Sequence, residues 1–330
     1  MGNNLNGYAK RYERKGKMSG RTKRQHVVPR FYLRHFTQAD GELWTHDCVS
    51  GNARRSTPEK TAYETNIYTP IGEDGERIEL IEDALAKIES QAALIYPDLL
   101  SFRPLSNDAK QDFAVFLATM FARSPAQLRQ FAQIMAQMGL WAGKHDMERD
   151  YRKKEENGSL SSLDAIIRDL LHRNDIYTMS VDRRVGLIAF QQAETLADVM
   201  TRMAWNYEIS ESQQVATSDN PMFWVKGGGP AGIGSEGFGL GNPFAVIPFP
   251  LSPNVILRLD WHPEIAWKKM KLDRRRAKLA NQYQAKYKER FLFFRDQDHG
   301  LSTLAMKYKD PANLFDAGVT SPKIDVVRKL

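Results

Sequence analysis

The sequence predicts an α+β protein in which a mixed or antiparallel sheet, built from N- and C-terminal strands, packs against a central helical layer. Short, turn-bounded segments with strand patterns occur before residue 70 and again after Trp205, whereas apolar residues recur at helical spacing from about 76 to 204. Strands at both ends with helices between them are typical of α+β folds. Because the N-terminal strands need partners that the C-terminal half supplies, we expect residues 23–310 to form a single domain.

Two terminal segments lie outside this predicted domain. Residues 1–22 are polar and lack periodicity, which predicts a disordered basic arm, and residues 311–330 are expected to form a C-terminal tail. The sequence has one cysteine, Cys48, which excludes an internal disulfide and makes a reducing, cytoplasmic setting the natural default. No apolar run approaches the length of a membrane span, so no membrane partner is expected.

The first predicted elements surround Pro29. This proline favours extended geometry in the residue before it, so residues 26–28 are expected to form a short strand. Proline also suits the first position of a helix, so a helical turn is expected to begin there. Three apolar side chains would share one face of that turn: Tyr32, Leu33 and Phe36. Residues 41–48 alternate like a strand, and residues 65–69 predict a second extended segment.

The middle of the chain is predicted to be helical. Apolar residues at helical spacing predict an amphipathic helix that stops at Pro97, and Ser106 is a suitable N-cap for the next helix, which is interrupted at Ser124-Pro125. The remaining predicted segments are a helix to about Gly143, a charged stretch over residues 144–158 that is an exposed extension or a linker, a helix from a capping box at Ser161 and Asp164 to about His172, and a helix from Val185 to Met203.

After Trp205 the pattern changes to short strands separated by turns. These strands are expected at residues 205–209, 214–217, 222–225, 245–249 and 255–259. A basic helix from about Asp273 to Glu289 follows, and then a buried strand over residues 291–294. The C-terminal part is therefore expected to supply most of the sheet.

The net charge of +7 is concentrated in two segments. The stretch from Lys10 to Arg24 has eight Lys and Arg against one Glu, and the stretch from Lys268 to Arg290 has ten against two acidic residues. Concentrated positive charge attracts phosphate-rich partners, so the two segments predict binding to DNA or RNA. A solubilising tail and one solvated helix face are the alternative interpretation.

The stretch from Gln25 to Pro29 is the first candidate site. His26 would lie just before a helix N-terminus, whose partial positive charge favours the neutral imidazole that binds metal or accepts a proton. The stretch resembles the first half of the ββα-metal (HNH) nuclease motif, in which a histidine at a strand end is the general base. Gln25 stands where that motif commonly has a metal ligand, and a structural histidine that caps the following turn is the alternative.

Glu82 and Glu89 are the second candidate. They lie two turns apart on one face of a predicted helix, beside its apolar stripe. Half-buried carboxylates there could hold a divalent ion. The alternative is an ion pair with Arg30 or Arg34, which needs a single match of charges.

Asp219 and Asn220 are the third candidate. They follow a predicted strand in the segment from Thr217 to Pro221, whose residue types form turns between side chains and backbone. An acidic group at a strand end, beside a hydroxyl and an amide, is also a frequent arrangement in functional sites. A structural turn and a functional corner are both consistent with the sequence.

Six separated segments carry a family resemblance. They are Gln25–Pro29 with Tyr32, Leu33 and Phe36, Asn66–Tyr68, the helix with Glu82 and Glu89, Arg123–Pro125, Thr217–Pro221 and Pro250–Pro253. In order and spacing they resemble domain-of-unknown-function family 4238 over residues 23–295. The resemblance brings no established activity, but it implies recurring polar positions at His26, Arg30, Glu82, Glu89, Arg123, Ser218, Asp219 and Asn220.

We expect most of these polar residues to line one cleft. They are His26, Arg30, Glu82, Glu89, Arg123, Asp219 and Asn220. In an enzyme, His26 would be the general base, the glutamates or Asp219 would hold Mg²⁺ or Mn²⁺, and the arginines would face a phosphate, which describes metal-assisted phosphodiester hydrolysis. The alternative is a non-catalytic nucleic-acid- or protein-binding module whose polar cluster is structural. Donors that converge on one point would favour the enzyme, and pairing of each acid with an arginine would favour the binding module.

Overall fold

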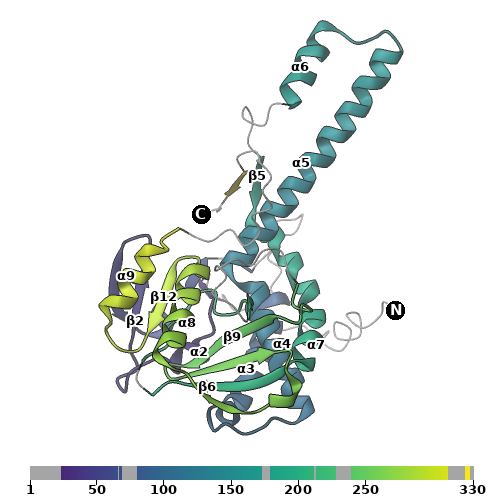
Figure 1. Cartoon of the computed structure of the whole chain (residues 1–330). Coiled ribbons are helices and arrows are strands. Elements are labelled where there is room, and N and C mark those ends of the chain that lie inside the picture. Colours follow the sequence, from purple (N-terminus) through teal and green to yellow (C-terminus); the bar gives the residue numbers. More distant parts are fainter. Residues whose placement is uncertain are drawn as a thin grey trace, which may run out of the picture.

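The structure is a computed structural model that describes residues 24–65, 67–68, 80–172, 179–211, 213–227, 239–310 and 324–327. The chain has the α+β fold that the sequence predicts, with strands from both ends of the chain and helices between them in sequence (Figure 1). The predicted basic arm over residues 1–22 lies outside the described residues.

The five-stranded sheet is formed entirely by the C-terminal half of the chain. Its order is β11 (Lys269–Lys271), β6 (Ala204–Ile209), β10 (Val255–Asp260), β9 (Ala245–Ser252) and β8 (Val225–Lys226). β10 pairs antiparallel with both β6 and β9, whereas β11 pairs with β6 in parallel. The sheet is therefore mixed, and its order differs from the order of its strands in the sequence.

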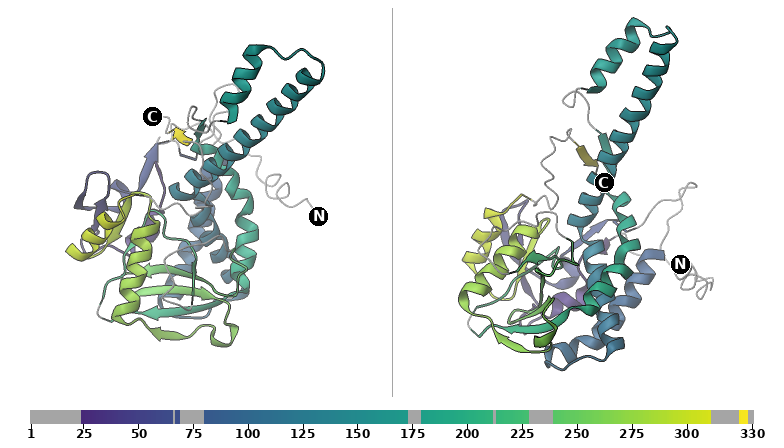
Figure 2. Two further views of the ribbon diagram at one scale, coloured as in Figure 1. Left: turned by 45° about the horizontal axis from the view of Figure 1, so that its top comes forward. Right: turned by 45° about the vertical axis from the view of Figure 1, so that its right-hand side comes forward.

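The two faces of this sheet differ because side chains alternate along each strand. Trp205, Tyr207 and Leu257 point into the main core, where they are fully buried. That core is covered by α3 (Leu80–Leu100), α4 (Asn107–Arg123) and α7 (Ala193–Arg202). The opposite face carries Asn206 and Glu208 and is covered by α8 (Arg274–Tyr287) (Figure 2).

A four-stranded sheet joins the two ends of the chain. Its order is β3 (Asn52–Ser56), β2 (Leu43–Asp47), β12 (Phe291–Phe294) and β7 (Thr217–Ser218). β2 pairs antiparallel with β12, with Asp47 opposite Phe291 and Trp44 opposite Phe294. An N-terminal strand therefore has its partner in the C-terminal half, as the sequence predicts. Helix α9 (His299–Lys307) packs on this sheet through Leu301 and Ala305.

Two small sheets complete the described strands. β1 (Arg24–His26) pairs antiparallel with β4 (Tyr63–Thr65), and β5 (Met179–Asp182) pairs in parallel with β13 (Ile324–Val327). The predicted strands over residues 26–28 and 65–69 are therefore displaced toward the N-terminus. Backbone pairing continues one residue beyond β1, because the N–H of Val27 bonds to the carbonyl of Ala62 at 2.8 Å.

Helix α2 (Arg30–Arg34) fixes the N-terminal motif in the main core. Its three predicted apolar residues are fully buried: Tyr32, Leu33 and Phe36. The hydroxyl of Tyr32 lies 2.6 Å from Oγ1 of Thr217 and donates to the carbonyl of Pro250 at 2.9 Å. This one side chain therefore ties α2 to a strand of each of the two larger sheets.

Helix α5 (Pro125–Glu156) continues well beyond Gly143, so residues 144–156 are an exposed extension of the helix, as one of the two predicted alternatives has it, and not a linker. Lys, Arg and Glu are good helix formers, and their side chains one turn apart support the helix further. Arg152, for example, lies 3.6 Å from Glu148. This part of the helix is largely solvent-exposed and has no apolar stripe, so the sequence contains no periodic signal that would predict the helix there.

Helix α6 (Ser162–His172) turns back along α5. The predicted capping box is confirmed, since the backbone N–H of Asp164 donates to Oγ of Ser161 at 3.0 Å and Asp164 accepts from the N–H of Ser161 at 2.9 Å. Arg168 of α6 forms ion pairs with Glu148 and Glu155 of α5. These contacts make α5 and α6 a helical hairpin.

Two other helix boundaries differ from prediction. Helix α3 passes through Pro97 and ends at Leu100, one turn beyond the predicted stop. The helix expected from Val185 to Met203 is a 3₁₀ segment, η2 (Arg183–Gln192), followed by α7. Residues 183–192 include a glycine and β-branched residues, which are weak helix formers.

The substitution Tyr32→Phe should destabilise the fold while leaving the ring in place. Removal of the hydroxyl leaves the buried carbonyl of Pro250 without this donor, so we expect the free energy of unfolding to fall by about 1–3 kcal/mol. Chemical denaturation monitored by circular dichroism measures this change. The matched control is Tyr283→Phe, whose half-buried hydroxyl has no hydrogen bond within the described chain. Equal losses in the two variants would contradict the role given to the Tyr32 hydroxyl.

Candidate functional site

Two predicted site residues of the N-terminal half, His26 and Glu89, meet at Arg123. This residue ends α4 because Ser124 caps the following helix, with its side chain accepting from the N–H of Gln127. Its guanidinium is buried, with Nη1 donating to Oε1 of Glu89 and Nη2 donating to the carbonyl of His26, each at 2.5 Å. The ring of Tyr68 lies beside the guanidinium, with its centroid 5.5 Å from Cζ of Arg123. Arg123 therefore holds β1, α3 and the end of α4 together.

The imidazole of His26 lies beside this contact. Burial lowers the pKa of His26, and the positive charge of Arg30 lowers it further. The neutral form of the imidazole is therefore favoured, as the sequence predicts. The largest cause of the lowered pKa is burial, whereas the sequence argument invoked the N-terminus of a helix. Nε2 of His26 is buried and has no hydrogen-bond partner within the described chain. The imidazole also packs edge-on against Tyr63, with ring centroids 6.0 Å apart.

Glu89 is paired, but with a different arginine from those the sequence suggested. Arg34 forms an ion pair with Glu59 at 3.0 Å instead, and Arg30 is exposed on the solvent side of α2. Glu82 is half-buried near the start of α3, seven residues and so about 10 Å along the helix from Glu89. The ion-pair interpretation thus gave the right kind of contact for Glu89 and the wrong partner.

Asp219 forms a second polar centre at the end of β7. Its carboxylate is 2% exposed and accepts three backbone hydrogen bonds, from Glu289 at 2.8 Å, Arg290 at 2.7 Å and Phe291 at 2.9 Å. Burial raises the pKa of Asp219 to about 7, against the opposing effect of these N–H groups. The side chain therefore fixes the start of β12 in its position beside β7.

Asn220 extends the same structural role. Its Nδ2 donates to the carbonyl of Tyr287 at 2.8 Å, which satisfies a carbonyl at the C-terminus of α8. The preceding hydroxyl, on Ser218, donates to Oε1 of Gln284 at 2.8 Å. The segment from Thr217 to Pro221 is thus a structural corner that joins β7 to the end of α8.

The two centres are linked through the first turns of α5. Arg129, six residues after Arg123, places Nε 3.1 Å from both carboxylate oxygens of the buried Glu289. Arg290 in turn pairs with Asp47 through two hydrogen bonds of 2.8 and 2.6 Å. Among the predicted site residues, His26 and Glu89 therefore lie around Arg123, and Asn220 lies beside Asp219, so the structure has two connected centres in place of one cleft.

These residues do not fit a divalent cation. Among the described residues, no group of three or more His, Cys, Asp and Glu side chains could hold a metal ion. The chemistry of the donors gives the reason, because the carboxylate of Glu89 already binds the cation of Arg123 and that of Asp219 is occupied by three N–H donors. Mg²⁺ and Mn²⁺ need several oxygen ligands around one point, whereas Glu89 and Asp219 lie in different polar centres.

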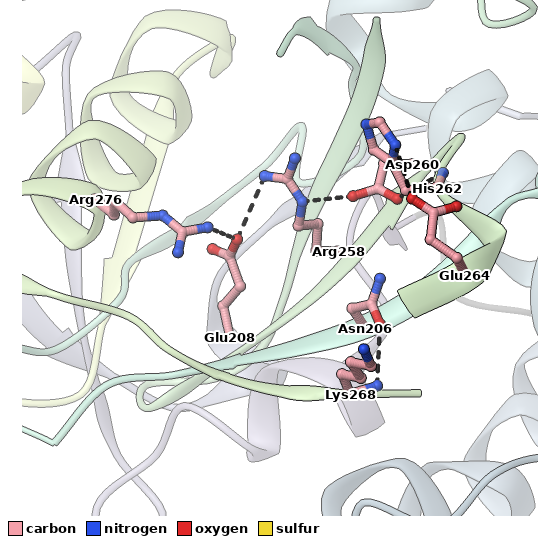
Figure 3. Close-up of polar contacts among 8 residues, drawn as sticks. All are labelled: Asn206, Glu208, Arg258, Asp260, His262, Glu264, Lys268 and Arg276. Atoms are coloured by element: carbon pink, nitrogen blue, oxygen red, sulfur yellow. Dashed lines mark hydrogen bonds and ion pairs between the residues drawn. The ribbon is translucent and has the colours of Figure 1, made fainter. Parts of the chain in front are cut away.

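A third polar network, which sequence reasoning missed, anchors α8 to the face of the five-stranded sheet that carries Asn206 and Glu208 (Figure 3). Arg276, in the first turn of α8, forms an ion pair with Glu208 on β6. Arg258 on β10 lies 3.4 Å from Glu208 and 2.8 Å from Asp260. Both acids, Glu208 and Asp260, are buried, and each has an arginine partner. The sequence signal that could have revealed this network is the alternation of polar and apolar residues in the strands that become β6 and β10.

Six other cations of this region are exposed to solvent. Those exposed on β11, α8 and the residue before β11 are Lys268, Lys269, Lys271, Arg274, Arg275 and Lys278. Lys271 pairs with the exposed Glu211 at 3.1 Å, whereas the other five have no ion-pair partner in the described part of the chain. We call these five residues the basic surface. Three arginines in the first turn of α8 oppose the helix dipole, so helix stability does not explain their position.

The fold and these centres define an α+β protein with internally paired acids and one uncompensated basic surface. Residues 24–298 match the family described as "Protein of unknown function (DUF4238)", and the chain belongs to that family. No curated protein and no solved structure matches the chain. Across the described residues, no helix has the length and apolar character needed to cross a membrane.

The pKa of Asp219 predicts a specific pH dependence of stability. Between about pH 4 and pH 7 this group is protonated in the folded chain and ionised in the unfolded chain. Its contribution to stability is therefore complete below pH 4 and is lost as the pH rises through 7, with a slope of about 1.4 kcal/mol per pH unit at most.

Denaturation of the intact protein and of Asp219→Asn at a series of pH values isolates this contribution. The free energy of unfolding of the intact protein should fall relative to that of the variant between pH 5 and pH 7. A difference that stays constant over this range would show that the pKa of Asp219 is not raised in the folded chain.

Proposed function

We propose that this protein is a non-catalytic nucleic-acid-binding module and that the basic surface contacts the phosphate backbone. The observation that supports the proposal is a contrast in charge pairing. The acids of the described polar centres are matched by arginines or backbone donors, as Glu89 is by Arg123, Glu289 by Arg129 and Asp219 by three N–H groups. The five cations of the basic surface have no such partner among the described residues and are exposed.

The basic surface is carried by a firmly attached helix. Arg276 binds Glu208 beneath the first turn of α8, and Asn281 bonds to the backbone of Ala216 at 2.8 Å and of Gln214 at 2.9 Å in the middle of the helix. A surface that is held in place before binding loses less conformational entropy on association. The rigid attachment of α8 thus favours contact with a regular array of phosphates.

The local charge pattern favours nucleic acid over a protein partner. The segment from Lys268 to Arg290 has ten basic residues and two acidic ones, and five of the cations are exposed without compensation. Phosphates at regular spacing can engage several such cations at once and release their counterions. In this proposal the arm from Lys10 to Arg24 adds further charge, and the buried polar centres maintain the fold.

The metal-assisted nuclease that the sequence also predicts has weaker support. His26 is neutral and has an unpartnered nitrogen, which suits a general base. However, Glu89 and Asp219, which were to hold the metal, are engaged by donors of the protein itself. Geometry therefore supports the binding module better.

Charge reversal on α8 tests the proposal. The triple variant Arg274→Glu, Arg275→Glu, Lys278→Glu should bind a labelled DNA duplex or RNA strand at least tenfold more weakly, because it replaces phosphate contacts with repulsion. The slope of log Kd against log salt should also fall by about one for each lost contact. Fluorescence anisotropy at several salt concentrations measures both quantities.

The matched control carries the same change of charge elsewhere on the surface. Arg54, Lys60 and Lys309 are exposed and have no ion pair among the described residues. Their triple replacement by Glu should change Kd less than threefold. Equal weakening in both triple variants, or none in either, would remove α8 from the account. Cleavage of the labelled strand with Mg²⁺ or Mn²⁺ that His26→Ala abolishes would favour the nuclease instead.

A further inference from the structure

The helical hairpin of α5 and α6 exposes an unusual share of the large apolar side chains. The seven that lie on it are Met135, Met138, Trp141, Met147, Leu163, Ile166 and Leu170, out of thirteen exposed large hydrophobic residues in the described chain. Trp141 is 71% exposed and Leu163 is 65% exposed. Single exposed apolar residues are ordinary, but a concentration on one element marks an interaction surface.

The outer part of the hairpin also lacks a core of its own. Of the side chains described between residues 137 and 170, Tyr151 is the one that is buried. The hairpin extends away from the sheets in all three views, so the body of the protein does not cover this outer part (Figures 1 and 2). Two helices rarely bury enough apolar surface alone, whereas four helices form a stable bundle.

The charge of the hairpin is compatible with a second copy of this chain as the occupant. Residues 125–172 contain seven basic and seven acidic residues, so the hairpin is neutral although the whole chain carries +7. A neutral surface with both signs interspersed does not select a strongly acidic or a strongly basic partner. It can face an identical surface without net repulsion, which a twofold-symmetric interface requires.

We propose that the chain forms a homodimer in which the α5–α6 hairpins of two copies pack into a four-helix bundle. The apolar side chains of both hairpins form the core of the bundle, and the charged residues remain at its rim. The proposal does not rest on nucleic-acid binding, because the hairpin and the basic surface are separate parts of the chain.

The double variant Trp141→Glu, Ile166→Glu tests this dimer in the full chain. Light scattering after size exclusion should give twice the monomer mass for the intact protein over a hundredfold range of concentration. The variant should elute as a monomer, with its dimer dissociation constant raised at least a hundredfold. Both side chains are mainly exposed, so the helical circular-dichroism signal should not change.

The control variant is Leu94→Glu, which places the same charge at an equally exposed apolar residue on α3. Leu94 is 74% exposed, close to the 71% of Trp141, and it lies outside the hairpin. This variant should remain dimeric. An intact protein that is monomeric throughout, a dimeric double variant, or a monomeric Leu94→Glu would overturn the proposal. A monomer that instead sediments with neutral lipid vesicles through Trp141 would assign the surface to a membrane.

Discussion

The buried guanidinium of Arg123 is the contact on which the arrangement of the N-terminal half depends. It binds the carboxylate of Glu89 on α3 and the carbonyl of His26 at the end of β1, and Tyr68 packs against its face. A buried charge of this kind is tolerated because its partners replace the water that it has lost, and removal of one partner typically costs 3–5 kcal/mol. Arg123 is thus the cation that neutralises Glu89 in the described structure.

The same arrangement recurs at each polar centre of the described chain. Asp219 is held by backbone N–H groups, Glu289 by Arg129, and Glu208 by Arg258 and Arg276. Internal pairing of these acids with arginines or backbone donors stabilises the contacts between sheet and helices. Five exposed cations without an ion-pair partner among the described residues lie close together in sequence on β11, α8 and the residue before β11, which is why the proposed function lies on the surface of the molecule.

Much of this architecture follows from local sequence signals. The alternation in β2, the apolar run of β12, the caps at Ser106 and Ser161, and the break at Ser124-Pro125 all depend on neighbouring residues, which the sequence shows directly. For the charged half of α5 the sequence leaves an extension and a linker both open, because an exposed helix carries no apolar stripe. The residues of the site were named, but their partners were not, since nothing local indicates that Arg123 rather than Arg30 reaches Glu89. Such pairings depend on how distant elements pack.

The central claim is that the acids of the site are satisfied by the protein, and binding of Mn²⁺ tests it most directly. Electron paramagnetic resonance of the free ion, recorded while Mn²⁺ is titrated into the intact protein, counts the ions that the chain removes from solution. The account predicts that the signal matches that of protein-free buffer, and that Glu89→Gln and Asp219→Asn leave it unchanged. Uptake of one Mn²⁺ per chain that either substitution abolishes would contradict the account.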